Sequence, residues 1–184
     1  MRQPFDAYET PDHYVAALLH VVQIGGCVFE PCDGDGAISR WFPHVITNDI
    51  RLGAHDWCED ATKPEVWERA VRHGCRWAVT NPPYRHANAI VSAAIDYGPP
   101  NLAFLLQLSF LEPTQARATM LADFPPAALI VLPRHRFVGR GTDSVTCAWM
   151  LWGPVAERLP RRVICLSRQA CHNLARTLVP SVPA

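Results

Sequence analysis

The turn at residues 81–84, which reads Asn-Pro-Pro-Tyr, is the stretch whose side chains are best suited to chemistry. It follows an apolar run that is typical of a buried parallel strand. Pro82 and Pro83 have no N–H to donate to a neighbouring strand, so the strand must end at Asn81 and the turn must be stiff. The Asn81 amide oxygen and the Pro82 carbonyl can accept hydrogen bonds from one NH2 group, and the Tyr84 ring can stack on the planar system that carries it. The turn therefore predicts a site for an amino group on a planar substrate, with an ordinary strand-ending turn as the alternative.

A glycine-containing loop at residues 30–36 is the second candidate site. It begins with Glu30 directly after a short apolar strand, and it contains Gly34 and Gly36 just before a predicted helix from Ala37 to about Trp41. Glycines let a backbone approach a ligand closely, and a following helix places that ligand near its N-terminus. The loop is not a P-loop, because no Gly-Lys-Ser/Thr follows, and it lacks the third glycine of the dinucleotide fingerprint. We predict a nucleotide-like cofactor here, with a plain turn as the alternative.

Acidic residues follow the next two predicted strands. Asp49 ends the second strand and lies at a suitable remove from the glycine loop to accept hydrogen bonds from ribose hydroxyls. Glu59 and Asp60 follow a third, poorly formed strand and could bind the amino group of an adenine. A solvated acid at a strand end is the alternative for Asp49.

Strands and helices alternate along the chain, which predicts the α/β class with a mainly parallel sheet and helices on both faces. The predicted strands are residues 27–29, 45–49, 55–57, 77–80, 102–108, 128–132 and 145–152, with an edge strand at 161–167. The predicted helices are residues 11–24, 37–41, 64–73, 86–97, 113–121 and 169–178. The link at residues 132–145 is short and has no helical pattern, so the last long strand should be antiparallel.

The first helix is predicted to begin at residues 10–12, Thr-Pro-Asp. Thr10 would cap it through its hydroxyl and Pro11 would occupy the first helical position. Its apolar residues recur at helical spacing, so it should cover one face of the sheet until Gly25 and Gly26 end it.

Length and composition limit the class of protein. A chain of 184 residues with 49% hydrophobic residues suits one globular domain, expected over residues 1–184 with its core at about 8–152. The apolar runs are too short to cross a bilayer and the N-terminal residues lack an apolar signal region, so we expect a cytoplasmic protein without a membrane partner. Seven scattered cysteines without a C-x-x-C pair argue against a disulfide framework or a structural metal site.

These motifs together resemble the S-adenosylmethionine-dependent methyltransferases of Rossmann-like fold, most closely the amino-methyltransferases that modify N6 of adenine in DNA. The resemblance covers about residues 8–152. It rests on the loop at 30–36, on Asp49, on Asp60 and on the Asn-Pro-Pro-Tyr turn, and the Tyr-x-Thr-Pro sequence at residues 8–11 is similar to a helix-start motif that contacts the methionine part of the cofactor. The Asn-Pro-Pro-Tyr motif is shared with enzymes that act on RNA bases and on protein glutamine amides.

The resemblance implies S-adenosylmethionine as the cofactor and a role for each matched residue. Glu30 and the glycine loop would hold the methionine end, Asp49 the ribose, and Asp60 the adenine. The implied cofactor residues are Tyr8, Thr10, Pro11, Glu30, Pro31, Cys32, Gly34, Gly36, Asp49, Ile50, Asp60, Ala61 and Asn81. The implied catalytic residues are Asn81, Pro82, Pro83 and Tyr84. Tyr84 would stack on a base that is flipped out of the duplex.

Two features depart from the family pattern. Asp33 and Asp35 make the cofactor loop unusually acidic, and because like charges would repel the cofactor carboxylate, Asp33 is expected to point away from the site. No long segment remains for recognising a target sequence, which leaves a partner protein or a dimer as one possible source of specificity. The candidate phosphate contacts on DNA are Arg85, Arg134, Arg136 and Arg140, with a solvated loop as the alternative for the last three.

The most favoured function is therefore methylation of adenine N6 in DNA, of the kind expected in a phage or mobile element. The alternatives are methylation of an RNA base amino group or of a protein glutamine amide. A cofactor-binding subunit without catalytic activity is a third possibility of a different class.

Overall fold

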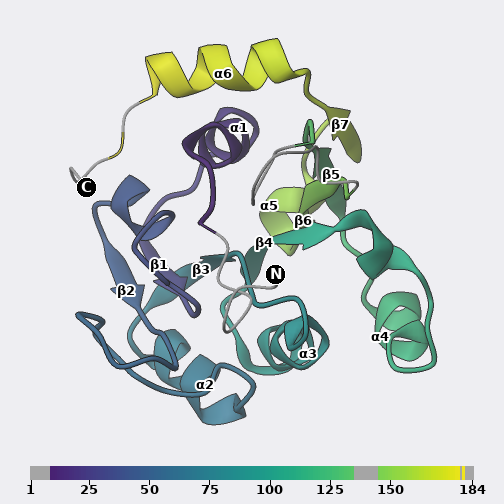
Figure 1. Cartoon of the computed structure of the whole chain (residues 1–184). Helices are drawn as coiled ribbons and strands as arrows, with labels where there is room; N and C mark the ends of the chain where they lie inside the picture. The colour runs from purple at the N-terminus through teal and green to yellow at the C-terminus, as the bar shows by residue number, and fades with distance from the viewer. Residues whose placement is uncertain (1–8, 135–144, 179, 181–184) are drawn as a thin grey trace.

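One seven-stranded sheet organises the chain (Figure 1). The structure is a computed structural model that describes residues 9–134, 145–178 and 180. The strand order is β2-β1-β3-β4-β6-β5-β7. The strands are β1 (Cys27–Glu30), β2 (Val45–Thr47), β3 (Cys75–Thr80), β4 (Asn101–Gln107), β5 (Ala128–Val131), β6 (Cys147–Trp152) and β7 (Val163–Cys165). Neighbouring strands are parallel except where β6 pairs with β4 and with β5, which confirms the predicted α/β sheet with its antiparallel last long strand.

Helices cover both faces of the sheet. They are α1 (Asp12–Val21), α2 (Pro64–Arg72), α3 (Ala87–Tyr97), α4 (Ala118–Asp123), α5 (Pro154–Glu157) and α6 (Arg168–Thr177), with 3-10 turns at η2 (Ser39–Trp41) and η3 (Leu108–Leu111). One core lies between the sheet and α1, with α5 and α6 contributing to it, and the other lies between the sheet and helices α2 and α3. Figure 1 shows α1 and α6 on one side of the sheet and α2 and α3 on the other.

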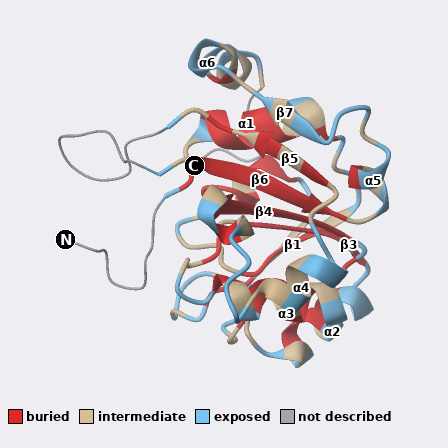
Figure 2. Cartoon of the chain, turned by 90° about the vertical axis from the view of Figure 1, so that its right-hand side faces the viewer, coloured by how far each residue is buried: buried red, intermediate tan, exposed pale blue. Residues whose placement is uncertain are grey.

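The strands in the middle of the sheet are buried on both faces (Figure 2). Successive residues of β4 and β6 enter opposite cores, so Ala103 and Trp149 pack on the α1 side while Phe104 and Met150 pack on the α2–α3 side. This explains why both strands are almost continuously apolar. The Trp149 indole N–H donates to the carbonyl oxygen of Tyr14 at 2.8 Å, which fixes α1 on the sheet.

The direction of the strands places several loops at one edge of the sheet. Strands β1, β2, β3, β4, β5 and β7 run the same way, so the loops that follow them lie at a common carboxyl edge. At the opposite edge Cys27 pairs with Cys75 across β1 and β3, and their sulfur atoms lie 3.2 Å apart. Ligands of open α/β sheets bind at the carboxyl edge.

Several predicted elements are shorter than expected. The helix predicted at residues 37–41 is only the 3-10 turn η2, because Pro43 restricts Phe42 to an extended conformation (φ −118°, ψ 124°) and so prevents a helix from continuing. The third predicted strand is a single bridge between Asn48 and Trp57. The helix predicted at residues 113–121 begins only at Ala118, after a turn closed on the Thr114 carbonyl.

The prediction for the start of the first helix was also wrong. Pro11 takes the capping position with an extended backbone (φ −65°, ψ 140°), and the helix begins at Asp12 without a side-chain cap. The Thr10 hydroxyl does not cap the helix and instead binds Asn81. The helix ends at Val21, before the glycines that were expected to stop it.

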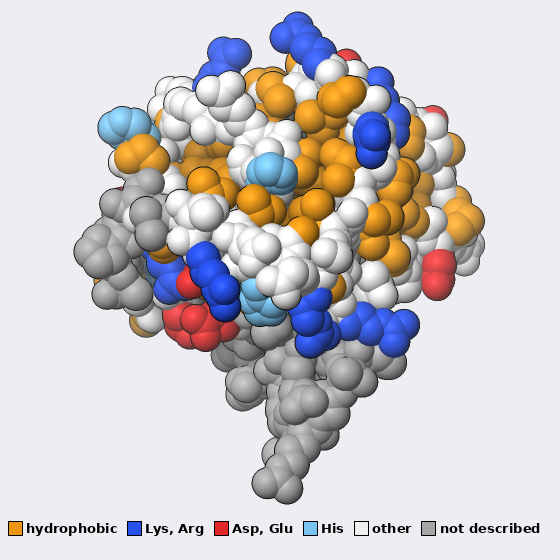
Figure 3. All heavy atoms as spheres, turned by 90° about the horizontal axis from the view of Figure 1, so that it is seen from above, with side chains coloured by type: hydrophobic (Ala, Val, Ile, Leu, Met, Phe, Trp, Pro, Cys, Tyr) orange, Lys and Arg blue, Asp and Glu red, His pale blue; other side chains and the backbone are white. Residues whose placement is uncertain are grey.

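The side of the molecule that carries α6 also carries η2, which stands where a longer helix was predicted. Figure 3 shows this side, with hydrophobic side chains spread over the face and Lys and Arg side chains near its rim. Leu174 and Ala175 of α6, and Leu178 directly after the helix, are only partly buried against the core. No helix in the described part of the chain is both long enough and apolar enough to cross a membrane.

Candidate cofactor and amino-group site

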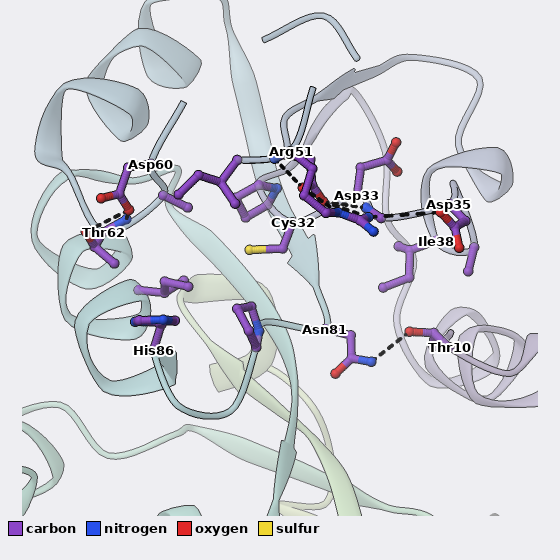
Figure 4. A pocket seen from close by; sticks show the side chains of 18 of the residues that line it. Thr10, Cys32, Asp33, Asp35, Ile38, Arg51, Asp60, Thr62, Asn81 and His86 are labelled. Carbon is purple, nitrogen blue, oxygen red and sulfur yellow. Dashed lines mark hydrogen bonds and ion pairs between the residues drawn. The ribbon is translucent and has the colours of Figure 1, made fainter. Parts of the chain in front are cut away.

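A cavity of about 630 Å³ lies at the carboxyl edge of the sheet, among the loops that follow β1, β2 and β3 (Figure 4). Cavities of a few hundred to about 1,000 Å³ are typical of small-molecule and cofactor sites. The predicted site residues that line it are Thr10, Pro31, Cys32, Gly34, Asp49, Ile50, Asp60, Ala61, Asn81, Pro83 and Arg85. The described candidates that do not line it are Pro11, Glu30, Gly36, Pro82, Tyr84 and Arg134. Tyr8, Arg136 and Arg140 lie outside the described residues.

The glycine loop is tied to the end of β2 by backbone hydrogen bonds. The Asp33 N–H donates to the Asn48 carbonyl oxygen at 2.9 Å, and the Gly34 N–H donates to Oδ2 of Asp49 at the same distance. Gly34 (φ +62°) and Gly36 (φ +79°) both adopt left-handed backbone conformations, which side chains other than glycine rarely accept. The two glycines therefore allow the tight turn that brings the loop against Asp49.

Asp49 is strongly held before any ligand is considered. Its Oδ1 accepts hydrogen bonds from the backbone N–H and from Nε of Arg51, at 2.8 Å and 3.0 Å. Burial raises the pKa of Asp49, but the hydrogen bonds from Arg51 and Gly34 outweigh it and hold that pKa below its usual range. The carboxylate is therefore ionised at neutral pH, and the guanidinium of Arg51 occupies part of the acceptor surface that ribose hydroxyls would use.

Two basic side chains offset the acidic character of the loop. Asp33 belongs to the loop that lines the cavity, but its side chain is only 7% exposed and packs against His55. Its Oδ2 lies 3.1 Å from Nδ1 of His55, and burial raises the pKa of its carboxyl group. Asp35 is exposed, and its carboxylate lies 4.0 Å from the Arg51 guanidinium.

Glu30 is completely buried beneath the loop. Its Oε1 accepts the Cys32 N–H at 3.1 Å, while Oε2 has no hydrogen-bond partner among the described residues. Burial, with the negative charge of Asp33 as a second cause, raises the pKa of Glu30 well above its usual value. In this structure Glu30 supports the turn of the loop from below and does not face the cavity.

The far wall of the cavity is formed by residues 59–62. Oδ1 of Asp60 accepts from the Thr62 backbone N–H at 2.9 Å and from the Thr62 hydroxyl at 2.8 Å. Burial raises the pKa of Asp60, but these two bonds bring it below its usual range. The carboxylate is thus held in one orientation at the cavity wall.

Asn48 joins the two walls and was not foreseen as a site residue. It is fully buried, and its amide nitrogen donates to the carbonyl oxygens of Pro31 at 2.9 Å and Glu59 at 3.0 Å. Its amide oxygen accepts the Glu59 N–H at 2.9 Å. The only sequence signal was a polar residue at a strand end, which the neighbouring Asp49 also provides.

The Asn-Pro-Pro-Tyr turn brings its amide to the same cavity. Asn81 lies at the cavity and donates from Nδ2 to the Thr10 hydroxyl at 3.1 Å (Figure 4). The turn that follows is closed by bonds to the carbonyl oxygens of Pro83 and Tyr84, so it does not use the Pro82 carbonyl. The Tyr84 hydroxyl lies 3.6 Å from the Cys147 sulfur on β6, and Tyr84 is half-buried without lining the cavity.

Basic residues lie at the rim and farther along the same edge. Arg85 and His86 are exposed at the cavity. Arg134 follows β5, is exposed, and accepts a hydrogen bond on its carbonyl oxygen from the Arg168 guanidinium at 2.9 Å. In the described ranges no group of three or more His, Cys, Asp or Glu side chains is arranged to hold a metal ion.

Comparison with known proteins supports the fold. No protein-family model matches the sequence, and no curated protein matches it. A candidate class I S-adenosylmethionine-dependent methyltransferase from Listeria monocytogenes aligns with a TM-score of 0.54 and 11% identity, over 92% of this chain and 70% of that chain. This likeness, together with the sheet topology, shows a Rossmann-like methyltransferase fold.

Two further solved structures align less well. Precorrin 8W decarboxylase from Methanobacterium thermoautotrophicum gives a TM-score of 0.48 and 14% identity, over 84% of this chain and 96% of that chain. A predicted O-methyltransferase from Agrobacterium tumefaciens gives 0.43 and 14%, over 86% of this chain and 85% of that chain.

Proposed function

We propose that this protein transfers a methyl group from S-adenosylmethionine to the exocyclic amino group, N6, of adenine in DNA. The observation that carries the proposal is that one cavity brings together the Asn81 amide and the acids Asp49 and Asp60. These groups come from three separate loops. The sequence assigned Asn81 to the target amino group, Asp49 to the ribose of the cofactor and Asp60 to its adenine.

The cavity suits the proposed cofactor in its size and in its acceptors. Asp49 is an ionised acceptor for ribose hydroxyls, provided that the Arg51 guanidinium shares or leaves its carboxylate. Asp60 is an acceptor for the adenine amino group, and the apolar side chains of Ile50 and Ala61 line the space between the two acids. Glu30 would act at the methionine end only through the turn that it supports, because the N–H groups of Cys32, Asp33, Gly34 and Gly36 already donate within the protein.

The protein's contribution to the reaction would be positioning and electrostatics. When bound, the cofactor supplies an electrophilic methyl group on a sulfonium. The Asn81 amide oxygen and the Pro82 carbonyl would accept hydrogen bonds from the target NH2, which draws the nitrogen lone pair out of conjugation with the ring and orients it. Such acceptors stabilise the positive charge that develops on nitrogen, and they need no covalent intermediate with the enzyme. Tyr84 would stack on the base once it has been flipped out of the duplex.

DNA is the proposed substrate because basic side chains lie on the same edge as the cavity. Arg85 and His86 stand at the rim, and the contact between Arg134 and Arg168 adds two guanidinium groups farther along. Phosphate contacts from such residues would hold the duplex while one base enters the site. RNA bases and protein glutamine amides carry similar planar amino groups and are the alternatives that an experiment must separate.

The test is to incubate the protein with isotope-labelled S-adenosylmethionine and, separately, duplex DNA, RNA and a glutamine-bearing protein extract. We expect label on adenine N6 of the DNA, identified after digestion to nucleosides. Asn81→Ala serves as the control for contaminating activity and should abolish most of the label. Label on RNA or protein alone would move the substrate to the corresponding alternative, and label on no acceptor would overturn the proposed function.

A further inference from the structure

The contact between Thr10 and Asn81 joins two segments that lie 71 positions apart in the sequence. Thr10 lies two positions before the start of α1, and Asn81 directly follows the last residue of β3. Thr10 is only 3% exposed, and its hydroxyl accepts the Asn81 Nδ2–H at 3.1 Å. This bond involves a hydroxyl that was expected to cap a helix or to contact the cofactor, and neither role explains it.

Thr10 is held rigidly because the beginning of α1 is fixed to the far half of the sheet. The Tyr14 hydroxyl donates to the Pro133 carbonyl oxygen at 2.5 Å, and the Tyr14 carbonyl accepts the Trp149 indole N–H at 2.8 Å. Tyr14 itself is 1% exposed. The segment before α1 therefore gives Asn81 a fixed hydrogen-bond partner.

The bond fixes where the Asn81 amide lies. One end of an asparagine amide only donates hydrogen bonds and the other only accepts them, whereas a threonine hydroxyl does both. Loss of the Thr10 hydroxyl would therefore leave the amide less firmly placed at the cavity. Figure 4 shows the Asn81 nitrogen directed to Thr10 and the oxygen on the opposite side of the amide.

We propose that Thr10 is a positioning residue for the amino-group site, and that its hydroxyl holds the Asn81 amide in place at the cavity, where the amide would meet the target NH2. This inference rests on the proposed function. It assigns Thr10 to the placement of the catalytic amide, where the family resemblance implied a contact with the methionine part of the cofactor.

The test compares Thr10→Val, which keeps the shape and removes the hydroxyl, with Thr10→Ser, which keeps the hydroxyl. The measurements are the single-turnover rate of methyl transfer to an adenine-containing duplex and the calorimetric affinity for S-adenosylhomocysteine. We expect Thr10→Val to slow transfer by about tenfold or more, since one oriented hydrogen bond is lost, while cofactor affinity changes by less than about twofold. Thr10→Ser should restore most of the rate.

Thr47→Val is the matched control. Thr47 is half-buried on β2, does not line the cavity, and its hydroxyl donates to the Asp56 carboxylate at 3.0 Å. The same isosteric change at Thr47 should therefore leave the transfer rate close to that of the parent protein. A rate that falls equally in both variants would show a general packing effect and would overturn the assignment.

A second measurement needs neither substrate nor cofactor. In protein labelled with 15N-asparagine, the Asn81 side-chain NH2 signal can be identified by its loss in Asn81→Ala. We expect its hydrogen exchange to be slow in the parent protein and in Thr10→Ser, and faster in Thr10→Val. Unchanged exchange in Thr10→Val would overturn the inference, as would a loss of cofactor affinity as large as the loss of rate. A parent protein that binds the cofactor but methylates no amino group would overturn the proposed function itself, and the role of Thr10 with it.

Discussion

At the scale of single residues, Asp49 combines a structural role with the proposed binding role. Its carboxylate fixes the glycine loop through Gly34 and also binds Arg51. A ligand that donates hydroxyl groups to Asp49 must therefore compete with a guanidinium that is already in place. This competition was not predictable from the sequence, because an arginine two positions after an acid is common on protein surfaces.

We expect Asp49→Ala to weaken the binding of S-adenosylmethionine at least about tenfold, since a buried hydrogen bond to a ribose is worth roughly 1–2 kcal/mol. Isothermal titration calorimetry measures the effect. Asp96→Ala is the control, because Asp96 is an exposed acid on α3 that does not line the cavity. If the Asp49→Ala protein remains folded and binds the cofactor with unchanged affinity, Asp49 is not part of the cofactor site.

The buried carboxyl group of Glu30 predicts a pH-dependent stability. The pKa of Glu30 is raised in the folded state. Below the usual value of 4.5 the group is therefore protonated in both the folded and the unfolded chain, and its titration does not change the free energy of unfolding. As the pH rises above that value, the unfolded chain releases the proton while the folded chain retains it, and the folded state loses stability until the pH passes the folded-state pKa.

Glu30→Gln removes this titration and keeps an oxygen for the Cys32 N–H. We expect the free energy of unfolding of the variant, relative to the parent, to increase as the pH rises above 4.5, the usual pKa of the group. Urea denaturation at several pH values measures it, with Glu65→Gln on the exposed side of α2 as the control. A difference that does not vary with pH would contradict the raised pKa.

The sequence predicted which residues reach the cavity better than it predicted their partners. Asn81, Asp49 and Asp60 were each identified because a polar residue follows an apolar strand. The carboxyl ends of parallel strands meet at one edge of the sheet, so such residues come close together. The roles of Asn48 and His55 depend on loops packed against one another, and no local pattern encodes such contacts. Tyr84 was assigned to the site by its ring, whereas the structure directs its hydroxyl toward β6.

At the scale of elements, strand ends were predicted well and helix starts less well. Apolar runs define buried strands directly, so the end of β3 at Thr80 was placed to the residue. The start of α1 and the missing helix after β1 depended on Pro11 and Pro43, whose effects extend to their neighbours. Proline restricts the preceding residue as well as itself, and the prediction had weighed only its preference for the first helical turn.

The turn after β5 provides a prediction at this scale, under the proposed function. If Arg134 contacts phosphate, Arg134→Ala should weaken DNA binding and flatten the slope of log affinity against log salt concentration by about one. Arg176→Ala is the matched control, because Arg176 is an exposed arginine in the last turn of α6. Fluorescence anisotropy over a salt series measures both slopes, and a parent-like slope in Arg134→Ala would make this turn an ordinary solvated segment.

At the scale of the whole molecule, β7 and α6 complete the fold on the side away from the cavity loops of β1 and β2. Strand β7 pairs with β5 and protects an edge that contains the fully buried Ile130. Helix α6 packs on α1 through the buried Cys171 and partly covers the apolar face seen in Figure 3. Strand β7 and helix α6 thus cover apolar surface on β5 and α1.

Removal of residues 161–184 should therefore lower the melting temperature and promote aggregation, because β5 would become an unprotected edge strand and α1 would lose its cover. Circular dichroism melting and light scattering measure the two effects. Removal of residues 179–184 alone is the control and should leave both close to the parent values. A monomeric, equally stable protein without residues 161–184 would show that β7 and α6 are dispensable for the fold.

The sulfur contact between Cys27 and Cys75 predicts how the protein responds to oxidation. Neighbouring strands lie about 4.8 Å apart, within the roughly 4.4–6.8 Å that a cystine spans between Cα atoms. Hydrogen peroxide could therefore take two electrons from this pair, forming a sulfur–sulfur bond and two molecules of water. That bond would covalently join β1 and β3, the strands that carry the glycine loop and Asn81. After mild peroxide treatment we expect a mass lower by two hydrogen atoms in the parent and in Cys58→Ser, and an unchanged mass in Cys75→Ser.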